Sequence, residues 1–196
     1  MQIEPMKHPS SRELFRYWTT LRGARPAPER DELDPGALRK VLGDSFVLTF
    51  DPAAGFPFRL AGTRLCGLAG RELKGTAFVD LWETESRPLV TALLGGAADE
   101  AAALAAGAVG LTDTEPPIPL ELVLLPLAHR RSLHERLLGL LVPLEIPYWL
   151  GISPVRRIRI GAFRNLTPWS SPSLVPAPLP ERTRPRLVVL EGGRVG

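Results

Sequence analysis

Apolar residues recur at helical spacing between Ser10 and Gly23. The residues of this stripe are Leu14, Phe15, Trp18 and Leu21. Ser10 and Glu13 have the spacing of a capping box, and Gly23 stands where glycine commonly ends a helix. The pattern predicts an amphipathic helix whose aromatic stripe packs on a sheet or on a second subunit.

Shorter elements follow this helix. Asp34 and Pro35 match a helix cap followed by the first helical residue, so a second helix is predicted there. Residues 46–50 are apolar and residues 58–62 alternate, which predicts two strands. The segment between them, residues 51–55, is rich in turn-forming residues, so we expect the strands to form a hairpin.

Residues 56–82 combine a strand, a tight turn and a short helix. Gly62 stands where the chain has to turn, a short apolar helical turn follows at residues 65–69, and Gly70 is a suitable stop. Gly75 interrupts the chain again before a group of large apolar residues. The apolar volume that these residues enclose is either part of the core or a ligand pocket.

The second half of the chain contains a helix and several strands. Residues 86–94 have helical spacing. Residues 97–106 favour a helix by propensity, whereas residues 108–112 are strand-like, and the pattern alone leaves this segment open. Residues 118–127, apart from a single glutamate, and residues 137–144 are apolar on both faces, as in the central strands of a sheet that is covered twice. One cover is the set of helices, and the other is the N-terminal helix, the tail or a partner.

The chain has 196 residues, enough for one domain and a tail. Cys66 is its single cysteine, which excludes an intrachain disulfide and fits a reducing compartment. The N-terminus has no signal-peptide pattern, and no apolar run approaches the roughly 20 residues that span a bilayer. We therefore expect a soluble protein of the cytoplasm without membrane contact.

The net charge of +3 hides an uneven distribution. The segment from residue 150 to the end contains eight arginines and two glutamates, so the preceding part is mildly acidic. Proline recurs between residues 168 and 185, which predicts an extended tail without a core, whereas residues 186–191 suit addition to a sheet edge.

The basic tail makes a nucleic-acid-associated regulator the alternative function. The tail has no recognition motif, and charge alone gives only a salt-sensitive attraction. We therefore favour a solvated linker over a nucleic-acid-binding segment.

Three segments and the order of the elements are similar to a PAS domain. The segments are residues 58–64 (FRLAGTR), 70–75 (GRELKG) and 122–126 (LVLLP), and the resemblance covers residues 12–149. The chain resembles the short single-PAS proteins of alphaproteobacteria. This resemblance implies an α+β fold with a five-stranded antiparallel sheet flanked by helices, in which residues 102–111 form the third strand.

Together with the patterns above, the resemblance divides the chain into three parts. We expect a disordered N-terminal segment (residues 1–10), a PAS-like domain that includes the N-terminal amphipathic helix (residues 11–149) and an extended, basic, proline-rich C-terminal tail (residues 150–196).

PAS domains generally sense small molecules, light or redox state, or mediate dimerisation. The resemblance therefore implies a sensory or adaptor module of signal transduction that binds a small molecule, a protein partner or both. We expect a homodimer, with the aromatic stripe of the first helix as its dimerisation surface, and a downstream signalling protein as partner. The expected ligand is small and either apolar or anionic, and the cofactor is unknown.

Enzymatic activity is not expected. The sequence contains no phosphate-binding loop, nucleophile elbow or metal-ligand cluster. An enzyme on a PAS-like scaffold is therefore the last of the alternatives.

Seven residues are candidates for lining a ligand pocket: Phe46, Arg59, Arg64, Cys66, Phe78, Trp82 and Leu140. Large apolar residues of this kind are more often core. Arg59 and Arg64 bracket the turn at Gly62, and a guanidinium group pairs well with a carboxylate or phosphate. The alternative for the two arginines is a solvated side chain or an ion pair with Asp80 or Glu72.

A single cysteine and a pair of histidines are the remaining candidates for a reactive or metal-binding site. Cys66 lacks the N-C-R-F-L-Q context of a flavin-attaching cysteine, so we expect a small core residue. His129 and His134 flank a predicted loop, but Arg130 and Arg131 stand between them and no third ligand is evident. We therefore predict no metal site.

Overall fold

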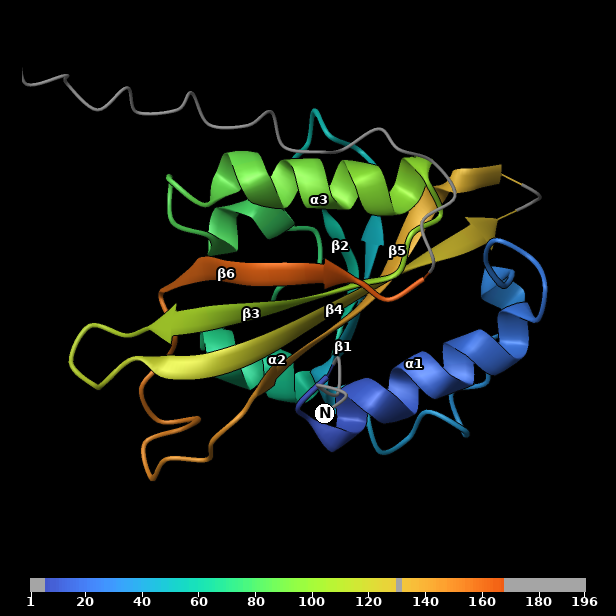
Figure 1. Ribbon diagram of the computed structural model, residues 1–196. Helices are drawn as coiled ribbons and strands as arrows, with labels where there is room; N and C mark the ends of the chain where they lie inside the picture. Colours follow the sequence, from blue (N-terminus) through green and yellow to red (C-terminus); the bar gives the residue numbers. More distant parts are fainter. Residues whose placement is uncertain (1–5, 130–131, 168–196) are drawn as a thin grey trace, which may run out of the picture.

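The computed structural model describes residues 6–129 and 132–167. The helices are α1 (Pro9–Arg22), α2 (Thr63–Ala69) and α3 (Arg87–Asp99), with short 3-10 turns η1 (Arg30–Glu32), η2 (Leu42–Asp44) and η3 (Phe78–Leu81). The strands are β1 (Ser45–Thr49), β2 (Phe58–Ala61), β3 (Leu104–Leu111), β4 (Ile118–His129), β5 (Ser132–Pro143) and β6 (Arg157–Asn165). Figure 1 shows these elements arranged around one twisted sheet.

The sheet has six strands in the order β2-β1-β5-β4-β3-β6, and all neighbouring strands are antiparallel. The predicted α+β class is confirmed, but the sheet has one strand more than the five that the resemblance implied. The extra strand, β6, pairs with β3 and lies beyond residue 149, where we expected the domain to end. Its alternation of arginine and isoleucine suits an edge strand, and Ile158 is buried in the core.

Part of the outer edge of β6 is covered by the segment that follows η3. The backbone N–H of Glu83 donates to the carbonyl of Ile158 (2.9 Å), and the N–H of Ile160 donates to Ser86 Oγ (3.1 Å). These bonds satisfy backbone groups that an open sheet edge would leave to solvent or to another chain.

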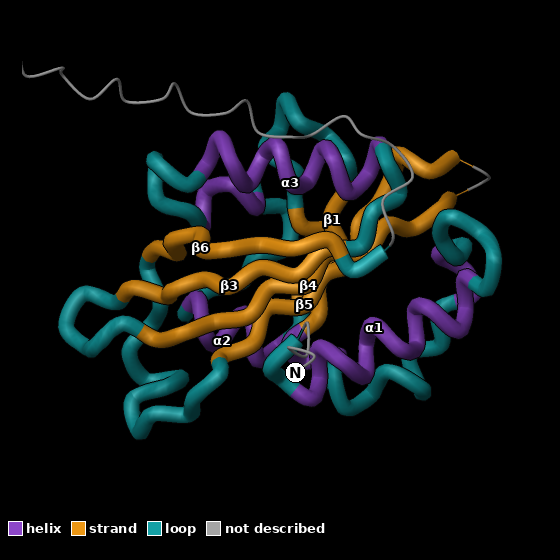
Figure 2. Tube along the Cα trace, in the orientation of Figure 1, coloured by secondary structure: helices purple, strands orange, loops and turns teal. Residues whose placement is uncertain are grey.

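Apolar side chains form two cores on opposite faces of the sheet. Leu122 and Leu124 of β4 point into the first core, which lies under α2, η3 and α3, whereas Val123 and Leu125 point into the second core, which lies under α1. Figure 2 shows α1 and α3 on different sides of the strands. The predicted double cover is confirmed, and the N-terminal helix of the same chain provides the second cover.

The first helix begins at Pro9 and ends before Gly23, close to the prediction. The predicted N-cap residue, Ser10, is wrong. His8 is the N-cap residue, and its Nδ1 accepts the N–H of Ser10 (3.2 Å), so Ser10 and Glu13 form no capping box. The helix therefore starts one residue before the predicted cap.

The second predicted helix is wrong, since residues 35–41 form consecutive turns that lead into η2. Asp34 Oδ1 accepts the N–H of Gly36 (2.8 Å), and such a local bond favours a turn over a helix. The ambiguous segment after α3 forms β3 from Leu104, close to the strand that the resemblance implied. Within the described part of the chain, every helix is too short or too polar to cross a membrane.

Candidate functional site

The apolar pocket candidates are divided between the two faces of the sheet. Phe46, Phe78 and Trp82 lie in the first core, and Leu140 lies in the second. The structure therefore does not bring all of the apolar candidates together around one site.

An aromatic cluster fills the space between the sheet and η3. The rings of Phe46, Phe58 and Phe78 lie 5.2–5.6 Å apart, and Trp82 lies 5.6 Å from Phe78. These spacings are those of favourable aromatic pairs. Gly139 of β5 lies directly against the ring of Phe46, and a Cβ atom there would overlap that ring. The glycine is therefore required for the cluster to pack onto the sheet.

A small cavity between α2, η3 and β5 has a volume of about 10 Å³. Its walls are apolar and include Leu65, Leu81 and Leu141. A water molecule needs a cavity of roughly 10–15 Å³ and several polar partners.

Phe46, Phe78 and Trp82 are at most 1% exposed and pack against one another, so this aromatic cluster is part of the core, and we call it the filled interior. A separate pocket of about 250 Å³ opens beside Arg64 and Asp44, at the end of α2.

Arg64 forms an ion pair that the sequence did not indicate. Its Nε donates to both carboxylate oxygens of Asp44 (2.9 Å each), and its Nη2 donates to Asp44 Oδ2 (2.6 Å). The hydrogen bond to Asp44 raises the pKa of Arg64. The suggested partners Asp80 and Glu72 are wrong: Asp80 pairs with Arg87, and Glu72 accepts backbone hydrogen bonds.

The FRLAGTR segment has a structural explanation. Phe58 belongs to the aromatic cluster, and Arg64 binds the end of η2 through Asp44. Gly62 lies against the carbonyl oxygens of Leu42 and Gly43, which a Cβ atom would overlap. The segment therefore joins β2 and α2 to the turn that starts β1.

The Arg64–Asp44 pair is unequally exposed, which gives a testable asymmetry. The Asp44 side chain is 10% exposed and the Arg64 side chain is 57% exposed. Arg64→Ala leaves a buried carboxylate without its cation, so we expect it to lower the free energy of unfolding by about 2 kcal/mol. Asp44→Ala leaves an arginine that water can solvate, and we expect about half that loss.

Urea unfolding of both variants and of the double variant measures this asymmetry. Arg71→Ala, at an exposed position on the turn after α2, is the matched control and should be nearly neutral. A loss for Asp44→Ala that equals or exceeds the loss for Arg64→Ala would contradict the prediction.

Cys66 and Arg59 lie at the margins of the fold. Cys66 is half-buried on α2, packs against the first core, and its Sγ lies 3.7 Å from Glu72 Oε1. The pKa of Glu72 is lowered, chiefly by the hydrogen bond from the Lys74 N–H. Arg59 is exposed on β2, at the point where the register between β1 and β2 shifts.

A groove lies on the face of the sheet that carries the second core. Its volume is about 460 Å³, and we call it the outer groove. Val47, Leu60 and Leu138 contribute to its floor, and the segment of residues 30–42 forms its opposite wall. The groove is open to the surface and lies outside the filled interior.

The connection between β5 and β6 presents apolar side chains to solvent. Ile146, Tyr148 and Ile152 are 87%, 86% and 78% exposed. Trp149 in the same segment is buried in the first core. We call residues 144–153 the apolar loop. No sequence pattern separated its exposed residues from core residues, because composition alone does not report burial.

The dimerisation candidates on α1 have two different environments. Leu14 and Trp18 are fully buried in the second core, so they are unavailable to a partner while α1 is docked. Phe15 and Leu21 are partly buried, and their role in association stays a prediction.

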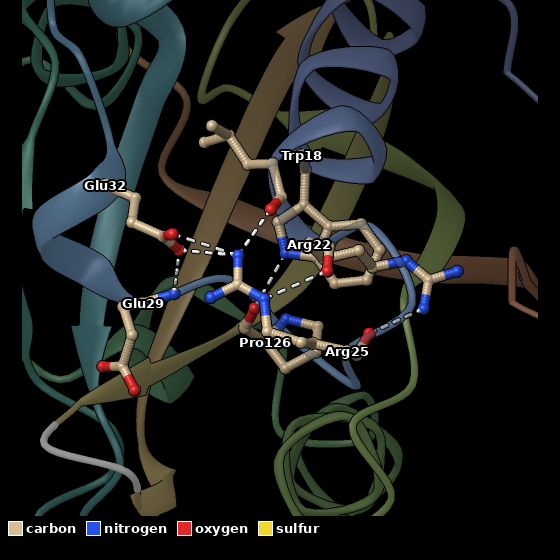
Figure 3. A network of polar contacts seen from close by, with 7 residues as sticks. Trp18, Arg22, Arg25, Glu29, Glu32 and Pro126 are labelled. Atoms are coloured by element: carbon tan, nitrogen blue, oxygen red, sulfur yellow. Dashed lines mark hydrogen bonds and ion pairs between the residues drawn. The ribbon is translucent and has the colours of Figure 1, made fainter.

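Polar contacts hold both ends of α1 in place. At its start, Glu121 of β4 is a buried carboxylate that accepts the N–H groups of Lys7 (2.6 Å) and His8 (2.9 Å). Toward its end, Trp18 Nε1 donates to the carbonyl of Pro126 (2.8 Å) (Figure 3). Glu121 had appeared in the sequence as the polar exception in an apolar strand, and the structure gives it an anchoring role.

The segment after α1 is fixed by a second set of contacts. Arg25 Nη2 donates to both carboxylate oxygens of Glu32 (3.1 and 2.9 Å), and Glu32 Oε2 accepts the N–H of Glu29 (2.8 Å) (Figure 3). The Arg22 guanidinium lies 5.0 Å from the centre of the Trp18 ring. These contacts place η1 beside the second core and next to the outer groove.

The two histidines of the predicted loop, His129 and His134, are described in their backbone only. The loop tip, residues 130–131, and the side chains of His129 and His134 lie outside what the structure describes. Among the described residues, no group of three or more His, Cys, Asp or Glu side chains gathers into a metal site.

A family model described as a PAS domain matches residues 6–142. The chain belongs to the PAS domain family. No curated protein matches the chain. The PAS match includes most of both cores and ends within β5, so the apolar loop and β6, which add Trp149 and Ile158 to the first core, lie beyond it.

Several solved structures are similar to this chain, each with a TM-score below 0.5. An RNA-binding Light-Oxygen-Voltage receptor is 14% identical, with a TM-score of 0.44 over 59% of this chain and 35% of that chain. The dark structure of the blue-light photoreceptor Aureochrome1 LOV is 11% identical, with a TM-score of 0.44, and the match covers 59% of this chain and 84% of that chain. A Rhodobacter sphaeroides LOV protein is 17% identical, with a TM-score of 0.43, and the match covers 59% of this chain and 71% of that chain.

At these identities and TM-scores the likeness carries no statement about what this chain does, and the chain spans about a third of the length of the first receptor. Membership of the PAS family makes the chain a sensory signalling module in the general sense of that family. The filled interior, the outer groove and the apolar loop are features of this particular PAS domain.

Proposed function

We propose that this PAS domain is a cytoplasmic adaptor in signal transduction that acts through protein contact and forms a homodimer through the apolar loop. The observation that carries the proposal is the exposure of Ile146, Tyr148 and Ile152 on one loop. Clustered apolar side chains on a protein surface mark interaction sites, whereas single ones need no explanation.

The apolar loop is held in one conformation, which favours binding. Trp149 anchors it in the core, and the N–H groups of Ile152 and Ser153 donate to the carbonyl of Trp149 (2.9 and 3.0 Å). Tyr148 Oη donates to Glu115 Oε2 (3.2 Å). A surface that is ordered before binding loses less conformational entropy on association.

The packed interior also supports an adaptor. The aromatic cluster occupies the space between the sheet and η3, and two pockets that border α2 have volumes of about 10 and 250 Å³. A ligand of ordinary size needs roughly 300–1,000 Å³. A signal that enters through a ligand in this space would first require the core to open.

The described part of the basic tail gives little support to nucleic-acid binding. Arg156 pairs with Asp113 (3.0 Å) and Arg159 pairs with Glu83 (2.7 Å), so two of its arginines already have acidic partners. Residues 168–196, which include the segment suited to sheet addition, lie outside the described residues. We also propose that the chain has no enzymatic activity, since no catalytic motif occurs in its sequence.

Sedimentation velocity tests the proposed homodimer. We expect a concentration-dependent dimer for the natural chain and a monomer for the triple variant Ile146→Ser, Tyr148→Ser, Ile152→Ser, because the substitutions remove the apolar contact surface. Leu89→Ser, at a partly exposed apolar position on α3, is the control and should leave the dimer intact.

Two results would contradict the proposal. A triple variant that dimerises like the natural chain would place the interface elsewhere. A natural chain that stays monomeric at all concentrations would exclude the homodimer. Circular dichroism of the triple variant should show an unchanged fold, since the substituted side chains are exposed.

A further inference from the structure

The outer groove has the size of a small-molecule site and a mainly aliphatic surface. Its volume of about 460 Å³ lies within the usual range for ligand pockets, roughly 300–1,000 Å³. Leu60 in its floor is 51% exposed, although it stands on a strand of the sheet. Covering an exposed leucine in an open apolar groove removes apolar area from water, which contributes favourably to the binding free energy of an apolar ligand.

The register of the sheet explains how the floor of the groove is built. Val47 of β1 pairs with Leu60 of β2 and with Leu138 of β5, so the three side chains share one face. The next pair of β1 and β5 on the same face is Thr49 with Arg136. Arg136 therefore follows Leu138 on the face that forms the floor of the groove.

Three arginines lie around this end of the groove: Arg30 is one of its lining residues, Arg59 directly precedes the lining residue Leu60 on β2, and Arg136 stands two residues before the lining residue Leu138 on β5. Arg59 occupies the position where the register between β1 and β2 shifts. Burial lowers the pKa of Arg136, and the charges of Arg59 and Arg30 lower it further. The acidic groups that face Arg136 are Glu135 and Asp31, which act in the opposite direction, and Asp31 already pairs with Arg30 (3.1 Å).

One donor in this arginine cluster lacks an acceptor. Nη1 of Arg136 is buried and has no hydrogen-bond acceptor within residues 6–129 and 132–167. A buried charged donor without a partner is costly. An anion at this end of the groove would accept from Arg136 and reduce the repulsion among the three cations.

The lining favours one class of anion. Its polar side chains are Arg30, Asp31 and Ser45, and Ser45 already donates to the carbonyl of Val41 (2.8 Å). A nucleotide would leave the polar groups of its base and sugar without partners against the aliphatic walls. A carboxylate with a saturated chain places its charge at the arginines and its methylene groups on the leucines.

We propose that the outer groove binds a free fatty acid, with the carboxylate at Arg30, Arg59 and Arg136 and the hydrocarbon chain along Val47, Leu60 and Leu138. This site lies on the face of the sheet opposite to the filled interior. The fatty-acid site depends neither on the apolar loop nor on dimerisation, so its test is independent of the test of the proposed adaptor function.

Isothermal titration calorimetry of the full chain with decanoate, below the micelle-forming concentration, tests the site. We expect one decanoate per protein chain, binding of decanol at least about tenfold weaker, and no binding of acetate. The reason is that the carboxylate and the hydrocarbon tail of decanoate both contribute to the binding free energy. Arg59→Gln, at an exposed position that folding tolerates, should weaken decanoate binding by about tenfold. Arg157→Gln, an exposed arginine on β6, is the matched control and should bind like the natural chain.

The proposal is overturned by any of three results: no binding of decanoate, equal binding of decanoate and decanol, or equal binding by the natural chain and Arg59→Gln. Leu60→Gln provides a second reading on the apolar wall and should also weaken decanoate binding. Arg136→Gln tests the unpartnered donor directly, provided that its circular dichroism spectrum matches that of the natural chain.

Discussion

Replacing Trp82 with alanine is expected to lower the free energy of unfolding by about 3–5 kcal/mol. Trp82 is fully buried in the first core, and its ring contacts Phe78 in the aromatic cluster. The substitution removes the burial of a large apolar surface and leaves a cavity that the surrounding rings and strands fill only in part. Urea unfolding followed by far-ultraviolet circular dichroism measures the loss.

Trp82→Phe separates the packing of the ring from its polar group. The indole Nε1 of Trp82 is buried and has no acceptor among the described residues. Phenylalanine removes this unsatisfied donor, so we expect a loss of less than about 2 kcal/mol. Trp18→Phe should cost more than Trp82→Phe, because Trp18 Nε1 donates to the carbonyl of Pro126, which would then lose its donor.

An exposed aromatic residue supplies the control for the Trp82 variants. Phe163→Ala, at a position 45% exposed and outside the apolar loop, should change the free energy of unfolding by no more than about 1 kcal/mol. A loss below 2 kcal/mol for Trp82→Ala would show that the aromatic cluster is not tightly packed. The filled interior, which supports the adaptor proposal, would then have to be reconsidered.

Replacing Glu121 with alanine is expected to lower the free energy of unfolding by about 3 kcal/mol. The carboxylate accepts two backbone N–H groups, from Lys7 and His8, and hydrogen bonds to a charged acceptor contribute about 1.5–3 kcal/mol each. Both donors immediately precede α1, so the loss should be largest at the start of this helix. Glu121→Gln keeps one acceptor oxygen and should show a smaller loss.

Hydrogen exchange locates the effect of the Glu121 substitution. We expect faster exchange in residues 8–15 of the variant and unchanged exchange in α3, which covers the other face. Glu100→Ala, at an exposed position after α3, is the matched control and should be nearly neutral. Uniformly faster exchange across the whole chain would contradict a local anchoring role for Glu121.

Both predictions concern how the sheet is covered. The central strands are apolar on both faces, and α1 covers one face in the same way as α2, η3 and α3 cover the other. Weakening the Glu121 contacts would expose the second core without disturbing the first. Association through the buried residues Leu14 and Trp18 would therefore require α1 to leave the sheet.

Much of the architecture could be predicted from residue patterns. The apolar stripe with Leu14 and Trp18 predicted α1, and the two-faced strands predicted a sheet covered twice. Helical and strand periodicities are local properties of the chain, so they survive in the sequence. The GRELKG and FRLAGTR segments carried the PAS resemblance, which the family match confirms.

Local patterns gave wrong predictions where a side-chain hydrogen bond determines whether the backbone forms a turn or begins a helix. Asp34 and Pro35 have the right spacing for a helix start, but the Asp34 carboxylate bonds the N–H of Gly36 and the chain forms turns. His8, rather than Ser10, caps α1. In both places the alternatives differ by a hydrogen bond or two, and residue spacing does not decide between them.

The sequence by itself determined the class of the fold, the family, the amphipathic first helix and the double cover of the central strands. Only the tertiary structure decided that Arg64 pairs with Asp44, that Glu121 anchors α1 and that β6 completes the sheet. It also placed Arg30 in the lining of the outer groove, and Arg59 and Arg136 on the strands that carry the lining residues Leu60 and Leu138. The physical reason is that periodicity reports which residues are buried, whereas the partner of each charge depends on strand order and register.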